Sequence, residues 1–369
     1  RPDAGATASS LPVGDVDTAL TSKSGQTSQD ASAPTTDEVD PAALVTIVVQ
    51  LDDGADRAAS LASINEAVAG AFPGSSTQVE RQYDKAMQGF ALSAPAGSLD
   101  AIRAVSGVKA AFLDRETHVD GVDDQVAGEG ATNSSRTSTQ NPDNLSAQLM
   151  MHADQITQKG DGKVIAVIDT GVDMTHPAFT GELAGTPPLT PQKVAAMTSQ
   201  LGEGKTGVYV SQKFPFAYDY GDGDTDVLAT EYGGDEARSA NNQGTHVAAL
   251  AAANGGHFSG AAPQAQLIVA KVTKDPGNSA SDVNLLAALD DAMVLKPDVV
   301  SVSFSKTEGL TDDAEALYSH VYEALGAQGT TVYAPAGDIE RYGRADDPDN
   351  GALGFPAAFS STLAVASVN

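Results

Sequence analysis

The chain contains no cysteine among its 369 residues, and it has no long run of apolar side chains. The absence of cysteine excludes a disulfide scaffold, thiolate zinc sites and a cysteine nucleophile. No stretch approaches the roughly 20 apolar residues that a membrane-spanning helix needs, so we expect no membrane span in this chain. The sequence begins at Arg1 without a charged-then-apolar leader. We therefore expect a signal peptide to be absent or already removed.

Positively charged side chains are scarce. Lys and Arg number 21 against 49 Asp and Glu, which gives a formal net charge of −28. Such a surface repels phosphate backbones, and this argues against nucleic-acid binding through basic patches. The hydrophobic content of 41% is that of a globular protein, and the length allows two or three domains.

The first third of the chain shows three changes of composition. Residues 1–43 have almost no large apolar side chains, so we expect them to be disordered, because they cannot bury enough surface to offset their chain entropy. Residues 44–119 follow the pattern strand–helix–strand–strand–helix–strand, which predicts a small ferredoxin-like α+β domain. In this pattern Asp56 is placed to cap the first helix and Gly107 to end the second. Residues 120–145 are rich in Gly, Asp, Ser, Thr and Asn, which is typical of an exposed linker.

Residues 146–369 predict an α/β fold, a parallel sheet with helices on both faces. Short apolar runs suited to fully buried strands alternate there with segments of helical spacing. The apolar runs are 164–168, 267–272, 299–304, 330–334 and 363–368, and the helical segments are 283–294 and 314–325. The stretch 181–240 is rich in Gly, Pro and Asp, and we expect it to form long surface loops.

A carboxylate and a histidine stand out in this part of the chain. The apolar run Val164–Ile168 is followed by Asp169–Gly171, and functional groups gather at the carboxyl ends of parallel strands. Further along, Gly244–His246 opens an Ala-rich helix and places the histidine in its first turn. Alone, either residue would be read as an ordinary cap or core position. Together they offer what a hydrolase needs, a buried carboxylate that orients an imidazole acting as general base.

These motifs, taken in order, resemble those of the subtilisin-like serine protease family. Val167–Asp173, followed by His176 and Pro177, resembles the Asp box of the family, and Gly244–Ala248 resembles its His box. Further segments that resemble the family are 260–265, 298–303, 333–338 and 355–357. Residues 44–119 resemble its inhibitory propeptide, and the whole is most similar to the large cell-envelope subtilases of Gram-positive bacteria.

The resemblance implies a precursor of a secreted or cell-surface bacterial serine endopeptidase that hydrolyses peptide bonds of proteins. It implies that His246 is the general base and that Asp169 orients it. It also implies that Ser301, Val302 and Ser303 line the substrate groove. The partners would be a protein or peptide substrate and the chain's own propeptide, which would aid folding and block the groove. His176 receives a structural role, and the remaining histidines are expected to be surface or satisfied residues: His118, His152, His257 and His320.

Three departures from the family pattern affect this interpretation. No Gly-Thr-Ser nucleophile box occurs, so we expect the serine to lie in a missing C-terminal part and residues 1–369 alone to be inactive. Gln243 replaces the histidine that usually begins the His box. Asp338 stands where the family has the Asn that donates a hydrogen bond to the oxyanion. An ionised carboxylate has no proton to donate, so Asp338 could serve there only while protonated.

Two alternatives to the enzyme stay open. One is a pseudoprotease that binds peptides without cleaving them, with Gln243 and Asp338 as signs of decay. The other is a propeptide-type inhibitor or chaperone. A Gly-Thr-Ser box in the reading frame past Asn369 would decide for the enzyme.

No cofactor is required by the chemistry of a serine peptidase. The segment Asp222–Asp226 offers carboxylates at alternate positions, as calcium-binding loops do, but Val227 stands where such loops need Gly. We favour an acidic surface loop here, and leave structural calcium open.

Overall fold

The computed structural model describes residues 39–118, 151–202, 207–228, 243–256, 258–275, 279–305, 312–336 and 353–366. These residues all belong to one unit, Ala33–Asn369. Most of the segment 1–43 and the whole of the predicted linker 120–145 lie outside the described residues.

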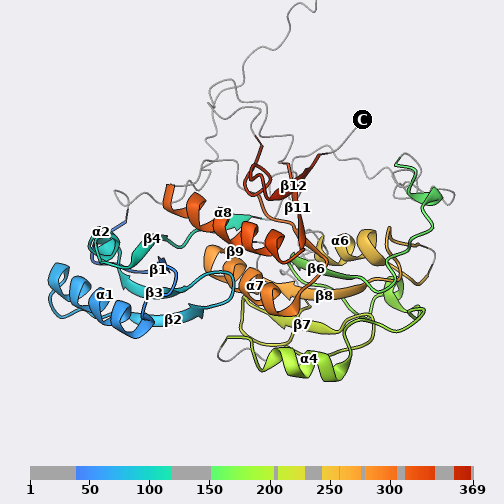
Figure 1. Ribbon diagram of the computed structural model, residues 1–369, viewed down its shortest axis with the longest axis horizontal. Helices are drawn as coiled ribbons and strands as arrows, with labels where there is room; N and C mark the ends of the chain where they lie inside the picture. Colours follow the sequence, from blue (N-terminus) through green and yellow to red (C-terminus); the bar gives the residue numbers. More distant parts are fainter. Residues whose placement is uncertain are drawn as a thin grey trace, which may run out of the picture. The chain divides into compact units, whose positions relative to one another are not determined.

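The N-terminal part forms a four-stranded antiparallel sheet with two helices (Figure 1). Its elements are β1 (Leu44–Leu51), α1 (Arg57–Ala71), β2 (Gln78–Tyr83), β3 (Gly89–Pro95), α2 (Leu99–Arg103) and β4 (Val108–Leu113), and the strand order is β2-β3-β1-β4. The Asp56 side chain caps α1 by accepting the backbone N–H of Ala59 at 3.0 Å. Gly107 follows α2 with a φ of +90°, a conformation that favours glycine. The predicted ferredoxin-like order of elements is confirmed.

The two faces of this sheet contribute to different cores. Side chains such as Ile47, Val49 and Phe90 pack against α1 and α2. Val48 and Phe112, which point to the other face, belong to the same hydrophobic cluster as the two helices α7 (Asp282–Leu295) and α8 (Asp312–Ala327) of the rest of the chain. The N-terminal sheet is therefore covered on both sides.

The rest of the chain is built on a six-stranded parallel sheet. Its strands are β6 (Val164–Asp169), β7 (Phe216–Asp219), β8 (Gln266–Lys271), β10 (Val299–Val302), β11 (Thr331–Pro335) and β12 (Thr362–Val365), in the order β12-β11-β10-β6-β8-β7. Among the described residues, the accompanying α-helices besides α7 and α8 are α4 (Pro191–Thr198) and α6 (Gln243–Ala252). A separate two-stranded pair joins β5 (Glu116–His118) to β9 (Ser279–Ser281).

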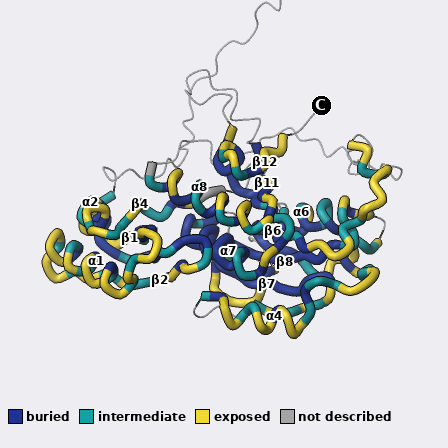
Figure 2. Tube along the Cα trace, in the orientation of Figure 1, coloured by how far each residue is buried: buried dark blue, intermediate teal, exposed yellow. Residues whose placement is uncertain are grey.

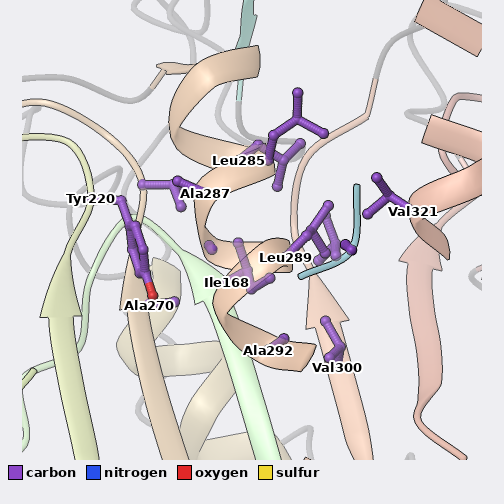
Figure 3. Close-up of a cluster of buried hydrophobic side chains, with 14 of the residues drawn as sticks. Ile168, Tyr220, Ala270, Leu285, Ala287, Leu289, Ala292, Val300 and Val321 are labelled. Carbon is purple, nitrogen blue, oxygen red and sulfur yellow. The ribbon is translucent and has the colours of Figure 1, made fainter. Parts of the chain in front are cut away.

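Helices cover this sheet on both faces, as the sequence predicts. Ile168, Ala270 and Val300 lie on the face that packs against α7 and α8, and Figure 3 shows them close to the apolar side chains of α7. Val167 and Val269 point the other way and pack against α6. None of the described helices is both long and apolar enough to cross a membrane.

The expectation of loops throughout 181–240 is wrong for two described segments. Helix α4 lies within this stretch, and strand β7 is buried at the end of the sheet beside β8. Figure 2 shows β7 in the buried class, like β6 and β8. The strand was missed because its apolar run is only Phe216–Tyr218, set among Gly, Pro and Asp residues that indicate loops.

Buried polar contacts join the N-terminal sheet to α7. The Asp290 carboxylate, which is 2% exposed, accepts the backbone N–H groups of Asp84, Lys85 and Ala86 at 3.3, 3.0 and 2.7 Å. The Tyr83 hydroxyl donates to the carbonyl of Val283 at 3.1 Å. Because an ionised acceptor strengthens a hydrogen bond, Asp290 is the strongest of these links.

We predict that Asp290→Ala lowers the free energy of unfolding by about 1.5–3 kcal/mol, since three donors in the 84–86 turn lose a charged acceptor. Urea denaturation followed by circular dichroism measures this change. Asp100→Ala is the matched control, because Asp100 is exposed and its ion pair with Arg103 lies at the surface. Equal destabilisation by both substitutions would contradict the role given to Asp290.

Candidate active site

Asp169 is a buried carboxylate at the carboxyl end of β6. It is 1% exposed, and its Oδ1 accepts the backbone N–H of Thr170 at 2.7 Å and the Thr170 hydroxyl at 3.2 Å. Its other oxygen, Oδ2, is buried and has no hydrogen-bond partner in the part of the chain that the structure describes. An unfilled carboxylate oxygen in a protein interior is costly, so this atom calls for a donor.

Burial dominates the electrostatics of Asp169. Loss of hydration disfavours the charged form and raises the pKa of this carboxyl from 3.8 to about 6, although the nearby Ser303 hydroxyl and the hydrogen bonds from Thr170 offset part of the rise. The group therefore ionises near neutral pH rather than in acid.

Helix α6 begins directly against Asp169. The backbone N–H of Gly244 donates to the Thr170 hydroxyl at 3.3 Å, and the Thr245 hydroxyl accepts the backbone N–H of Asp173 at 2.9 Å. A Cβ atom on Gly244 would collide with the carbonyl oxygen of Gly171 and lie 3.1 Å from Cβ of Asp169. Only glycine allows this close approach. The positive end of the helix dipole thus faces the carboxylate.

His246 lies in the first turn of the same helix, two positions after Gly244, and its side chain is exposed. The fold therefore brings the start of this helix against Asp169, while Gln243, and not His246, is among the residues that line the adjoining cleft. His176, in contrast, serves the local backbone, since its Nδ1 accepts the N–H of Ala178 at 3.2 Å.

An open cleft of about 270 Å³ lies beside α6, at the carboxyl ends of β10 and β11. The residues that line it are Gln243, Val247, Ser301, Val302, Ser303, Tyr333, Ala334, Pro335 and Val365. Most of this lining is apolar, and the predicted groove residues Ser301–Ser303 form one wall. Asp338 lies outside the described residues.

A lysine that sequence reasoning missed is buried next to this site. Lys271 ends β8, is paired in register with Asp169, and has no exposed surface. Its Nζ lies 2.6 Å from Asp219 Oδ2, 3.1 Å from Asp275 Oδ1 and 3.5 Å from Asp222 Oδ2. Burial lowers the pKa of Lys271, but the carboxylates of Asp219 and Asp275 outweigh it and raise the pKa. A lone charged residue at the end of the apolar run 267–272 is the signal that could have identified it.

The alternating carboxylates of the segment 222–226 do not act as one group. Asp222 turns toward Lys271, whereas Asp224 and Asp226 accept the backbone N–H groups of Asp226 and Leu228 at 2.8 and 3.2 Å. Within the described ranges, the three carboxylates close enough to share a metal ion are Asp219, Asp222 and Asp275. The Lys271 ammonium already supplies a positive charge among them.

The raised pKa of Asp169 predicts a specific pH dependence of stability. An acid whose pKa is higher in the folded state favours folding below its unfolded pKa, and that contribution is lost as pH rises through the folded pKa. Between pH 3.8 and about 6 the contribution of Asp169 should fall by about 3 kcal/mol, from 1.36 kcal/mol for each pKa unit. Asp169→Asn should therefore stabilise the protein by about that amount at pH 7 and change little at pH 3.5.

Urea denaturation of both proteins at several pH values measures this difference. Asp161→Asn, at an exposed carboxylate, is the control and should show a flat difference across the same range. A flat difference for Asp169→Asn as well would mean that Asp169 does not ionise at the expected pH.

Comparison with known proteins gives a consistent answer. Residues 160–369 match the model of the subtilase family. The chain is 29% identical over 234 residues to C5a peptidase of Streptococcus pyogenes, an alignment that covers 57% of this chain and 18% of that protein. It is 30% identical over 228 residues to the PII-type proteinase of Lacticaseibacillus paracasei, covering 57% and 11%.

A third relative is the minor extracellular protease Vpr of Bacillus subtilis, 27% identical over 230 residues, with 62% of this chain and 24% of Vpr covered. The chain thus spans less than a quarter of the length of these relatives. Its motifs, its parallel sheet and its match over more than half of its length lead to one conclusion: the chain belongs to the subtilase family.

Proposed function

We propose that the complete protein is a secreted or cell-envelope serine endopeptidase, in which His246 is the general base and Asp169 its orienting carboxylate. The observation that carries the proposal is the buried, unfilled Oδ2 of Asp169 against the helix that presents His246. The proposal requires the His246 imidazole, which is exposed and is not among the residues lining the cleft, to turn toward this oxygen and donate an N–H to it. The named relatives are a peptidase, a proteinase and an extracellular protease, which supports the same reaction class.

The reaction proposed is acyl transfer. A serine hydroxyl attacks the scissile carbonyl while His246 takes its proton, and His246 then returns that proton to the leaving amine. Asp169 holds the ring and stabilises the imidazolium that forms. Because the pKa of Asp169 is raised to about 6, this support is present only above about pH 6.

We place the serine in a part of the protein beyond Asn369. The sheet face next to α6 supports this placement, because Tyr333, Leu363 and Val365 are 39%, 49% and 54% exposed on neighbouring strands. Apolar side chains on a parallel sheet are normally covered. An apolar helix following the serine would cover them and bring the hydroxyl to the cleft beside Val247.

The proposed substrate is an extended peptide that adds to the edge strand β9. In the structure β5 occupies this edge, paired antiparallel with Glu116 opposite Ser281 and His118 opposite Ser279. Strand addition gives affinity through main-chain hydrogen bonds, which suits a protease that accepts many sequences. We propose that the N-terminal sheet belongs to the inhibitory propeptide. In this proposal β5 is the end of that domain, and it lies along β9 where the substrate would bind.

The first test is activity of a protein that includes the region beyond Asn369. We expect it to hydrolyse casein, and His246→Ala to lower kcat by roughly 10⁴–10⁶-fold, as loss of a triad base does elsewhere. His176→Ala is the control and should retain activity. Residues 1–369 alone should be inactive. Hydrolysis by that fragment, abolished by His246→Ala, would refute a serine outside it, and a stable, inactive full-length protein would favour the pseudoprotease.

A second prediction concerns the contact between α6 and β6. Gly244→Ala should push the helix away from Gly171 and Asp169, and a displacement of about 1 Å costs on the order of 10²-fold in turnover. Gly326→Ala is the matched control, since Gly326 lies in helix α8 with nothing within 4 Å of an added Cβ. Comparable kcat values for the two variants would show that the close approach of α6 is not needed.

A further inference from the structure

The residues of β5 and β9 do little by themselves to specify how the two strands are aligned. Each strand has three residues, and the partners are Glu116–His118 on one side and Ser279–Ser281 on the other. Register is specified where large apolar side chains must face a core, and weakly specified in short strands of small or polar residues. Something outside the pair must therefore hold β5 in place.

Arg115, the residue before β5, makes that contact with a single residue of α7. Its carbonyl accepts the backbone N–H of Asp282 at 2.9 Å, and its Nε donates to Asp282 Oδ2 at 2.9 Å. Main chain and side chain of Arg115 thus bind the same partner. A slip of β5 along β9 would break both contacts together.

The contact is buried and is supported from three sides. Arg115 is 8% exposed and Asp282 1%. The Tyr318 hydroxyl of α8 donates to the other oxygen of Asp282 at 2.6 Å, and the guanidinium lies 5.3 Å from the centre of the Phe112 ring. Asp282 also begins α7, where the helix dipole favours a carboxylate.

A second side-chain contact between the strands is weaker. Ser279 Oγ donates to Glu116 Oε2 at 3.0 Å, but both groups are exposed and water competes for them. Another arginine at this interface, Arg103, binds Asp313 at 2.9 Å while 37% exposed, and it lies away from β5 in the sequence. It offers a matched control.

We propose that Arg115 is a positioning residue: its double contact with Asp282 sets the register of β5 on β9 and thereby determines how the chain is presented along the substrate edge. One consequence of this proposal rests on the proposed function: the register determines which peptide bond is cleaved when the N-terminal domain is released. The register itself does not depend on activity.

Cysteine cross-linking measures the register directly, because the chain has no cysteine of its own. Thr117 and Ala280 are partners in the observed register. Directly opposite Cβ atoms lie close enough for a disulfide, whereas diagonal neighbours do not. The pair T117C/A280C should therefore cross-link on mild oxidation, and E116C/S279C, which meets only after a slip of two residues, should not.

Replacing Arg115 alone would leave the Asp282 charge buried, so the decisive variant is R115M/D282N, which removes both charges and keeps similar volumes. In this background we expect the T117C/A280C yield to fall and the E116C/S279C yield to rise. In R103A both yields should stay as in the unmodified protein. An unchanged pattern in R115M/D282N would overturn the proposal, and so would an equal shift in R103A.

The full-length protein supplies the functional readout. If it hydrolyses casein and releases its N-terminal domain, mass spectrometry should show one mature N-terminus with Arg115 and a shifted or mixed set in R115M/D282N. A single, unshifted N-terminus in that variant would overturn the proposal. If the full-length protein cleaves neither casein nor itself, the proposed function fails, and the cross-linking result still decides the role of Arg115.

Discussion

Helix α7 is buried on almost every side, and the arrangement of the molecule depends on the polar side chains that it buries. Asp290 holds the turn 84–86, and Asp282 binds Arg115 and Tyr318. Asp291 accepts the Tyr220 hydroxyl at 2.8 Å at the end of β7. Each of these groups would be costly to bury without a partner, so each one specifies a neighbour. One helix therefore ties the N-terminal sheet, α8 and the large sheet together.

The other face of the large sheet holds a buried carboxylate that is only partly compensated. Asp169 is buried with one oxygen unfilled, and burial raises its pKa to about 6. The charge of the nearby Lys271, in contrast, is buried and compensated, because carboxylates lie on several sides of it. Sites that keep a charge buried without full compensation are characteristic of function. The contrast between these two residues, paired in adjacent strands, distinguishes the candidate site from its structural surroundings.

The relatives are several times longer than the chain described, and this bears on the open face of β11 and β12. Tyr333 and Leu363 lie opposite each other in register with much of their surface exposed. In a parallel sheet of this family such a face is expected to be covered. The proposal of a serine-bearing helix thus joins a sequence observation, the missing nucleophile box, to a physical one, an uncovered apolar surface.

The sequence by itself determined the elements of the N-terminal sheet, most strands of the large sheet and the two residues proposed for catalysis. Periodicity in 44–113 and the apolar runs of the sheet are local properties, and Asp169 and His246 stand in local motifs at a strand end and a helix start. Only the tertiary structure decided which polar residues are paired in the interior. Arg115, Lys271 and Asp290 look like surface charges in the sequence, because burial is produced by segments distant along the chain. The short strand β7 was missed for the same reason, since its place in the sheet comes from pairing with β8 and not from its own few residues.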